Sequence, residues 1–213
     1  MFRLVLLLAC LPAISVRAET ADSAVLDRWI ARQAEIRTLS ADFTQTRALR
    51  VLRNPVAARG HLWFQAPGDF RWQVGEPPKV VVLRKDQDVR VIEPPKKTVE
   101  LSAMEQGRRA AGLLEIPFVR SRADLEKRFT ILDLKVQDTV CRLKLAPRDA
   151  QGFLTGVNLS FDTEAGHLIT LELAFRDGSS LRNEFSNVRM NDKLPAGIFA
   201  FDTAGYQVND AGR

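Results

Sequence analysis

The sequence predicts an α+β protein built on a single curved antiparallel β-sheet of about ten or eleven strands, with two or three helices laid on one face. Apolar and polar residues alternate along many short segments, which is typical of half-buried strands. The gaps between these segments are short and rich in turn residues, so they leave no room for crossover helices and neighbouring strands should be antiparallel. The 213 residues contain no linker, repeat or low-complexity segment, so we expect one domain.

The first eighteen residues have the pattern of a cleaved secretory signal peptide. Arg3 precedes an apolar run from Leu4 to Leu11, which is too short to span a membrane. Val16-Arg17-Ala18 places small side chains at the two positions that a signal peptidase reads. We therefore expect residues 1–18 to be removed and residues 19–213 to form the exported domain. The alternatives are a buried first element of the fold and a bacterial lipobox that ends at Cys10.

One amphipathic helix is predicted over residues 22–37. Asp22 or Ser23 can cap its first turn, and its apolar residues recur at helical spacing to form one face: Val25, Leu26, Trp29, Ile30 and Ile36.

The period changes to two from Leu39 onward, which indicates strands. After the strand that begins at Leu39, the expected strands are 58–66, 69–75, 79–85, 88–93, 98–101, 129–136, 139–146, 155–162, 167–176 and 180–190, with a last short candidate at 198–202. Residues 110–115 and 121–128 have helical composition, and Pro117 is the expected break between them.

The composition argues against several classes of function. Subtracting 26 acidic from 31 basic residues gives a net charge of +5, or +3 without Arg3 and Arg17, which does not indicate a nucleic-acid binder. The two histidines, His61 and His167, occur in strand patterns, and no catalytic, phosphate-binding or metal-binding motif is present. We therefore expect no enzymatic activity, no metal site and no cofactor. Cys141 lies in an alternating segment and is expected to be a small core residue.

Apolar residues occur on both faces of the strands between residues 58 and 85. Phe70 and Trp72 share one face, while the run from Val80 to Leu83 is apolar on both. A sheet with one face in water should alternate more cleanly, so either both faces are covered or one of them lines a cavity. An ordinary core is the alternative interpretation of any single aromatic residue here.

Arginines are dense in the first part of the expected domain. Seven occur between Arg28 and Arg59 against two acidic residues, and Arg47, Arg50 and Arg53 surround an expected hairpin bend. This region is either a solvated surface or a weak docking patch for an acidic partner or anionic head groups.

The chain resembles the LolA family of periplasmic outer-membrane lipoprotein carriers. The resemblance begins in Leu39-Ser-Ala-Asp-Phe-Thr-Gln-Thr and continues in Gly60-His-Leu-Trp-Phe-Gln-Ala-Pro-Gly-Asp-Phe-Arg-Trp. It spans nearly all of residues 22–208. The positions that match the family's pattern are Phe43, Gln45, Gly60, Leu62, Phe64, Pro67, Phe70 and Trp72.

The resemblance implies an incomplete, half-open β-barrel whose open face is covered by helices that act as a lid. It also implies a non-enzymatic carrier that takes lipoprotein acyl chains, or a related hydrophobic envelope lipid, into an apolar cavity and shuttles them through the periplasm toward the outer membrane. The expected cavity wall consists of Phe43, Leu62, Phe64, Phe70, Trp72, Val80 and Val82. The expected lid residues are Leu113, Leu114, Ile116 and Phe118.

The implied partners, besides the lipid, are an inner-membrane release complex and an outer-membrane acceptor, with the carrier itself a monomer that binds no nucleic acid. Family members usually carry an arginine immediately before the motif proline, which is thought to tie the lid to the barrel, and this chain has Ala66 there. The alternative function is a lipid-sensing interaction or regulatory module of the envelope without transport activity.

The signal pattern predicts that the exported protein begins at Glu19. N-terminal sequencing of the periplasmic fraction should find Glu19 first, because peptidase recognition of Val16 and Ala18 directs cleavage after Ala18. A product that stays in the cytoplasm, or one acylated at Cys10, would contradict this prediction.

Overall fold

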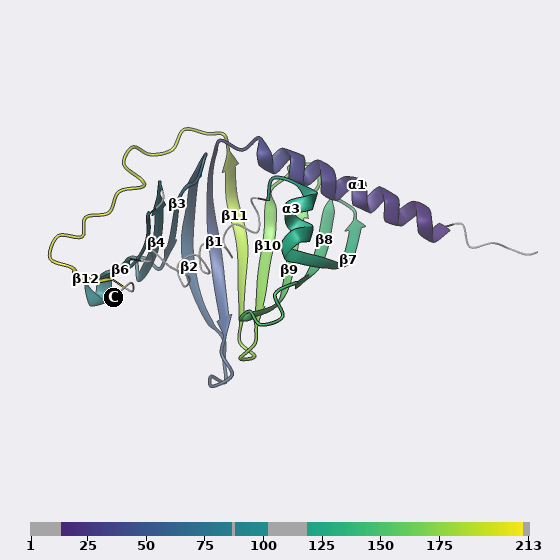
Figure 1. Ribbon diagram of the computed structural model, residues 1–213. Coiled ribbons are helices and arrows are strands. Elements are labelled where there is room, and N and C mark those ends of the chain that lie inside the picture. Colours follow the sequence, from purple (N-terminus) through teal and green to yellow (C-terminus); the bar gives the residue numbers. More distant parts are fainter. Residues whose placement is uncertain (1–13, 87, 102–118, 211–213) are drawn as a thin grey trace, which may run out of the picture.

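The computed structural model describes residues 14–86, 88–101 and 119–210. Within these residues twelve strands form one open, curved sheet in the order β12-β6-β5-β4-β3-β2-β1-β11-β10-β9-β8-β7 (Figure 1). Every pairing is antiparallel except that of β12 with β6. The predicted α+β class and open, mostly antiparallel sheet are therefore confirmed.

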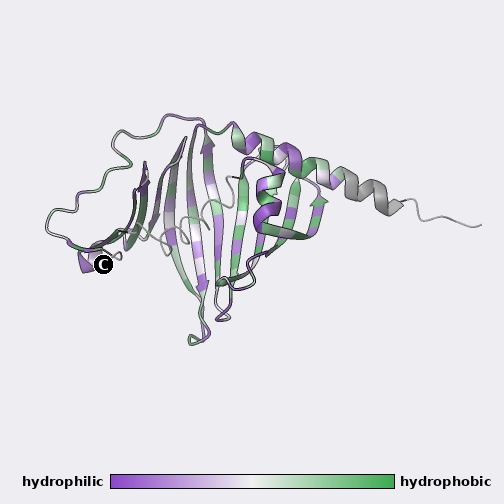
Figure 2. Ribbon diagram, in the orientation of Figure 1, coloured by the Kyte–Doolittle hydropathy of each residue, from purple (hydrophilic) through white to green (hydrophobic). Residues whose placement is uncertain are grey.

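The elements follow the chain in simple order. The helices are α1 (Ile14–Ala34), the short 3-10 helix η1 (Pro94–Lys96) and α3 (Arg122–Arg128). The strands are β1 (Thr38–Ala48), β2 (Val56–Gln65), β3 (Asp69–Val74), β4 (Val80–Lys85), β5 (Asp88–Glu93), β6 (Thr98–Leu101), β7 (Phe129–Gln137), β8 (Val140–Pro147), β9 (Leu154–Asp162), β10 (Leu168–Phe175), β11 (Ser180–Met190) and β12 (Gln207–Asp210). Figure 2 shows hydrophilic and hydrophobic bands alternating along several strands, as the sequence pattern requires.

The last predicted strand, at 198–202, is wrong. Residues 191–206, here called the C-terminal strap, cross the outer face of the sheet without forming a strand, and β12 follows at Gln207–Asp210. The backbone amides of Ile198 and Ala200 donate to carbonyls three residues earlier, and Arg71 donates to the carbonyl oxygens of the same two residues. Because these groups are already bonded in turns and to a side chain, they cannot form a strand ladder.

Helices α1 and α3 cover the inner face of the half that contains β7 to β10 (Figure 1). The predicted apolar face of α1 is buried there, with the Trp29 ring stacked on Phe161 at 4.4 Å between centroids. The Trp29 indole N–H also donates to the carbonyl oxygen of Gly166 at 3.1 Å. Cys141 lies in this cluster and is fully buried, and burial raises the pKa of its thiol to about 12. The expectation of a small core residue is confirmed.

Helix α1 ends at Ala34 rather than at the predicted residue 37. The amides of Glu35 and Ile36 donate to carbonyls three residues back, at Arg32 and Gln33, so the chain tightens into a turn. Ile36 is still buried, but it packs with the other half of the sheet.

The inner face of the half formed by β1 to β5 has a separate apolar cluster. The register aligns Leu39, Phe64 and Phe70 in one cross-strand row. A second row runs through Ala41, Leu62, Trp72 and Val82. Within the described chain no helix lies over this face, so its apolar side chains are available to form the wall of a site.

Gly60 makes room for the Phe43 ring of that cluster. A Cβ at Gly60 would lie 2.2 Å from the Phe43 ring and 2.4 Å from the carbonyl oxygen of Gln73. The Phe43 ring therefore packs directly over backbone and stacks on Trp72 with 4.0 Å between centroids.

The outer face of β4 to β6 is apolar too, and the C-terminal strap covers it. Val81, Ile92 and Val99 are buried there against Phe201 and Tyr206. Arg71 holds the strap by donating to the Ile198 carbonyl at 3.0 Å and to the Ala200 carbonyl at 3.2 Å. Its guanidinium also lies over the rings of Trp63 and Phe201, 5.7 Å from each centroid. The doubly apolar Val80–Leu83 run thus packs on both sides.

A charged cluster lies on the same outer face beside the strap. His61 contacts Asp42 through Nδ1 at 2.7 Å and Glu76 through Nε2 at 2.5 Å. Partial burial by itself lowers the pKa of His61, but the hydrogen bonds to Glu76 and Asp42 and the charges of these carboxylates outweigh it, so the pKa lies above 6.5. His61 is thus a structural residue of the outer face, as its strand pattern suggested.

We expect Gly60→Ala to destabilise the fold by about 1–3 kcal/mol, because the added methyl group forces the Phe43 ring or the β3 backbone to move. Urea unfolding measures the change. Gly156→Ala is the matched control, since the nearest atom to its new Cβ is the Ala174 methyl at 3.8 Å, an ordinary contact. Equal losses in the two variants would contradict the close packing at Gly60.

The His61 cluster should make stability fall as pH rises. The pKa of His61 is higher in the folded protein than its unfolded value of 6.5, so protonated His61 stabilises the fold. This stabilisation is fully present below pH 6.5 and is lost as the pH rises through the folded pKa. The urea midpoint, measured in steps above pH 6.5, should therefore decline in the parent protein and decline less in His61→Gln. His167→Gln leaves the cluster intact and should keep the parent slope. The prediction fails if His61→Gln keeps the same slope.

Candidate ligand-binding hollow

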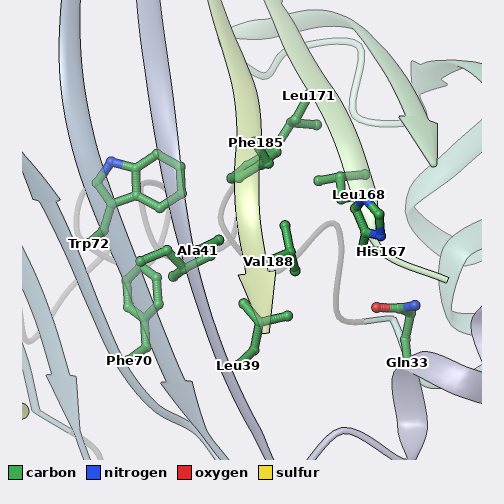
Figure 3. Close-up of a pocket in the computed structure, with 11 residues that line it drawn as sticks. Gln33, Leu39, Ala41, Phe70, Trp72, His167, Leu168, Leu171, Phe185 and Val188 are labelled. Atoms are coloured by element: carbon green, nitrogen blue, oxygen red, sulfur yellow. The ribbon is translucent and has the colours of Figure 1, made fainter. Parts of the chain in front are cut away.

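An open hollow lies on the inner face of the sheet, with about 500 Å³ of empty space including the part open to solvent (Figure 3). Nine of its eleven lining residues are apolar. They are Leu39, Ala41, Leu62, Phe70, Trp72, Leu168, Leu171, Phe185 and Val188.

Five strands supply this apolar wall. β2 and β3 contribute from one side, β10 contributes from the other, and the pair β1 and β11 forms the floor between them. Leu39 and Ala41 lie two residues apart on β1 and therefore point to the same face. The Phe185 ring, opposite Phe43 in the β1–β11 register, meets both Phe43 and Trp72 edge to face. The wall is continuous because β1 and β11 are hydrogen-bonded neighbours.

The two polar lining residues, Gln33 and His167, lie together at one edge of the hollow (Figure 3). Gln33 is on the last turn of α1, and its side-chain amide donates to the Gly166 carbonyl oxygen at 2.9 Å. His167 directly follows Gly166 and precedes β10. This contact fixes the end of α1 against the β9–β10 turn and gives the hollow one polar edge.

Three of the seven residues expected in the cavity wall, Leu62, Phe70 and Trp72, line the hollow. The other four belong to the same apolar cluster without lining it: Phe43, Phe64 and Val82 are buried, and Val80 packs against them. All seven expected residues therefore belong to one apolar cluster, and three of them line the hollow.

Sequence reasoning did not find the wall residues of β10 and β11, namely Leu168, Leu171, Phe185 and Val188. Leu168 and Leu171 are three residues apart, as are Phe185 and Val188, so simple alternation would place each pair on opposite faces. Register shifts in β10 and β11 bring both members of each pair to the hollow, and no strand pattern predicted these shifts. Leu39 and Ala41 could have been predicted from the sequence, because they lie at alternate positions with Phe43 on β1 and therefore share its face.

The residues expected in the lid, Leu113, Leu114, Ile116 and Phe118, lie outside the described residues. Where the described chain resumes, Val119 is buried in the cluster beneath α1, and the Arg120 guanidinium donates to the Pro67 carbonyl oxygen at 3.4 Å. Residues 119 and 120 therefore connect the helix-covered half of the sheet with the β2–β3 turn. Ala66, in that turn, packs against the apolar cluster of the hollow.

The described residues contain no group of three or more histidine, cysteine or carboxylate side chains that could hold a metal ion. Among the described helices, none is both long and apolar enough to cross a membrane. What the hollow offers is an extended apolar surface with hydrogen-bonding groups at one edge.

The described residues thus form a half-open, mostly antiparallel sheet with an apolar hollow on its inner face. The chain belongs to the LolA family: the family model described as outer membrane lipoprotein carrier protein LolA matches residues 34–202. Membership of this carrier family confirms the expected non-enzymatic character.

The named relatives have the same description. An outer-membrane lipoprotein carrier protein of Bordetella avium is 30% identical over 195 residues, which cover 92% of this chain and 88% of the relative. One from Dechloromonas aromatica is 27% identical over 165 residues, covering 78% of this chain and 77% of the relative. Among solved structures, an uncharacterized conserved protein from Thermus thermophilus matches with a TM-score of 0.53 and 10% identity, covering 89% of this chain and 99% of that one. The last match bears on the fold alone.

Proposed function

We propose that this protein carries the acyl chains of lipoproteins, or of a related hydrophobic envelope lipid, in the hollow and shuttles them through the periplasm toward the outer membrane. The observation that carries the proposal is the apolar wall of Leu62, Phe70, Trp72 and their neighbours, which no described helix covers, whereas the described structure covers the other apolar faces of the sheet. The family's description supports a lipoprotein as the cargo.

The physical requirement is to hide an acyl chain from water and still release it. Each buried CH₂ group contributes about 0.8 kcal/mol, so a free chain does not cross an aqueous compartment alone. An open hollow satisfies both needs, because the ligand enters laterally and no strand has to separate. A chain lying on this wall has its polar end beside Gln33 and His167, where the ester or amide linkage keeps hydrogen-bonding partners.

The proposal includes the route of the cargo. The signal pattern of residues 1–18 supports export, and the carrier then receives its cargo from a release complex in the inner membrane and delivers it to an acceptor at the outer membrane. We propose that it acts as a monomer.

Phe70→Glu should keep the fold and reduce uptake of a fluorescent fatty acid by tenfold or more. Phe70 is only 4% exposed, but its side chain lines the hollow, so we expect the new carboxylate to turn into that space, where water can solvate it and where it lies in the path of the acyl chain. Circular dichroism checks the fold, fluorescence titration measures uptake, and mass spectrometry of copurifying lipid identifies the natural ligand of the parent protein.

Phe161→Glu is the matched control for the hollow. Phe161 is fully buried against Trp29 beneath α1, so the same substitution there leaves a charge without water or a partner and should unfold the protein. If Phe70→Glu unfolds the protein as completely as Phe161→Glu does, Phe70 is an ordinary core residue, and the proposal that this wall binds an acyl chain is wrong. Unchanged uptake by folded Phe70→Glu would contradict it equally.

A further inference from the structure

The hairpin between β1 and β2 ends in an exposed tip that combines apolar and basic side chains. The tip loop, residues 49–55, extends beyond the ends of the neighbouring strands (Figure 1). Val51 is 88% exposed, Leu52 45% and Val56 54%, and these are three of the six large apolar side chains classed as exposed in the described part of the chain. Exposed apolar side chains gathered at one protruding point indicate a contact surface.

The charge around this tip has one sign. Residues 47–59 contain four arginines, Arg47, Arg50, Arg53 and Arg59, and no acidic residue. None of the four forms an ion pair with any residue that the structure describes. Asp177 of the adjoining β10–β11 turn has its pKa lowered chiefly by hydrogen bonds from Ser179 and in small part by the charge of Arg47. Because no described acidic residue is paired with these arginines, they are positioned to meet an anionic surface.

The shape of the tip favours a bilayer over a folded protein as that surface. A stable protein interface buries about 800 Å² on each partner and uses about 20–30 residues a side. The loop beyond the last β1–β2 pair, Arg47 with Val56, is far smaller than that and is convex. A few apolar side chains and basic residues are enough for reversible binding to anionic lipid, since contributions of apolar burial and of each charge add up.

We propose that the β1–β2 tip docks this protein on the surface of a bilayer that contains anionic phospholipid. Val51 and Leu52 enter the interface between head groups and acyl chains, while Arg47, Arg50 and Arg53 lie against the phosphates. Arg50 is already placed for this role, because its hydrocarbon stem packs over Gly178 of the β10–β11 turn. The inference does not depend on which ligand occupies the hollow.

The test is vesicle flotation with the whole protein. Vesicles of equal parts phosphatidylcholine and phosphatidylglycerol should bind the parent protein, vesicles of phosphatidylcholine alone should bind it far less, and added salt should weaken binding by screening. Arg50→Gln with Arg53→Gln should lower the affinity by roughly tenfold or more, as expected for two basic residues at an anionic surface. Val51→Asp with Leu52→Asp should abolish binding.

Two variants serve as controls away from the tip. Leu132→Asp changes an apolar side chain on β7 whose exposure, 57%, lies between those of Leu52 and Val51, and Arg142→Gln with Lys144→Gln removes two exposed positive charges from β8. Both should bind as the parent does. The proposal is overturned if the parent ignores phosphatidylglycerol vesicles, if the tip variants still float, or if the controls lose binding equally. If the parent protein does not bind vesicles but the tip variants lose cargo transfer, the tip contacts a protein partner, and this result would also overturn the proposal.

A fluorescent label at Val51→Cys gives a second, independent readout. Cys141 is fully buried and burial raises the pKa of its thiol to about 12, so reagent reacts at the tip and not at Cys141. The emission of an environment-sensitive label should shift to the blue with phosphatidylglycerol vesicles. An unshifted emission during flotation would place the contact elsewhere and contradict insertion of the tip.

Discussion

The pairing of β1 with β11 is the interaction on which the rest of this structure depends. It joins two meanders, β1 to β6 and β7 to β11, into one sheet, and it does so between strands that lie more than a hundred residues apart in the chain. Leu39 and Ala41 on β1 and Phe185 and Val188 on β11 flank this seam on the inner face. Without this pairing, the apolar faces of the two halves of the sheet would not join into one wall, and no hollow would form.

The described helices and the C-terminal strap cover some apolar faces of the sheet and not others, and this difference decides where a ligand can bind. Helices α1 and α3 bury the inner face of β7 to β10, and the C-terminal strap buries the outer face of β4 to β6 through Arg71 and Phe201. The apolar surface over β1 to β5 has no comparable cover among the described elements. Burial is worth about 25 cal/mol per Å² of apolar surface, so an acyl chain gains by covering what the described helices leave open.

The same strand, β1, connects this wall with the proposed membrane contact. Its first half supplies Leu39 and Ala41 to the hollow, and its far end leads through Arg47 into the exposed hairpin tip. A strand within a wide sheet is stiff, so docking at the tip would set the orientation of the hollow relative to the bilayer. Gly60 on β2 also supports the wall. Because it has no side chain, the Phe43 ring of β1 can pack directly against the β2 backbone.

The sequence by itself determined the strand pattern, the amphipathic face of α1 and, within a strand, which residues share a face, such as Leu62 with Phe64 and Phe70 with Trp72. These features are local, because side chains alternate along a strand with period two and recur on a helix with period 3.6. Only the tertiary structure decided that β11 lies beside β1, that Leu168, Leu171, Phe185 and Val188 complete the wall, and that residues 198–202 form part of a strap. Strand order and strap packing depend on contacts between distant residues such as Arg71 and Ala200, and no periodicity within a single segment encodes which distant partner it will meet.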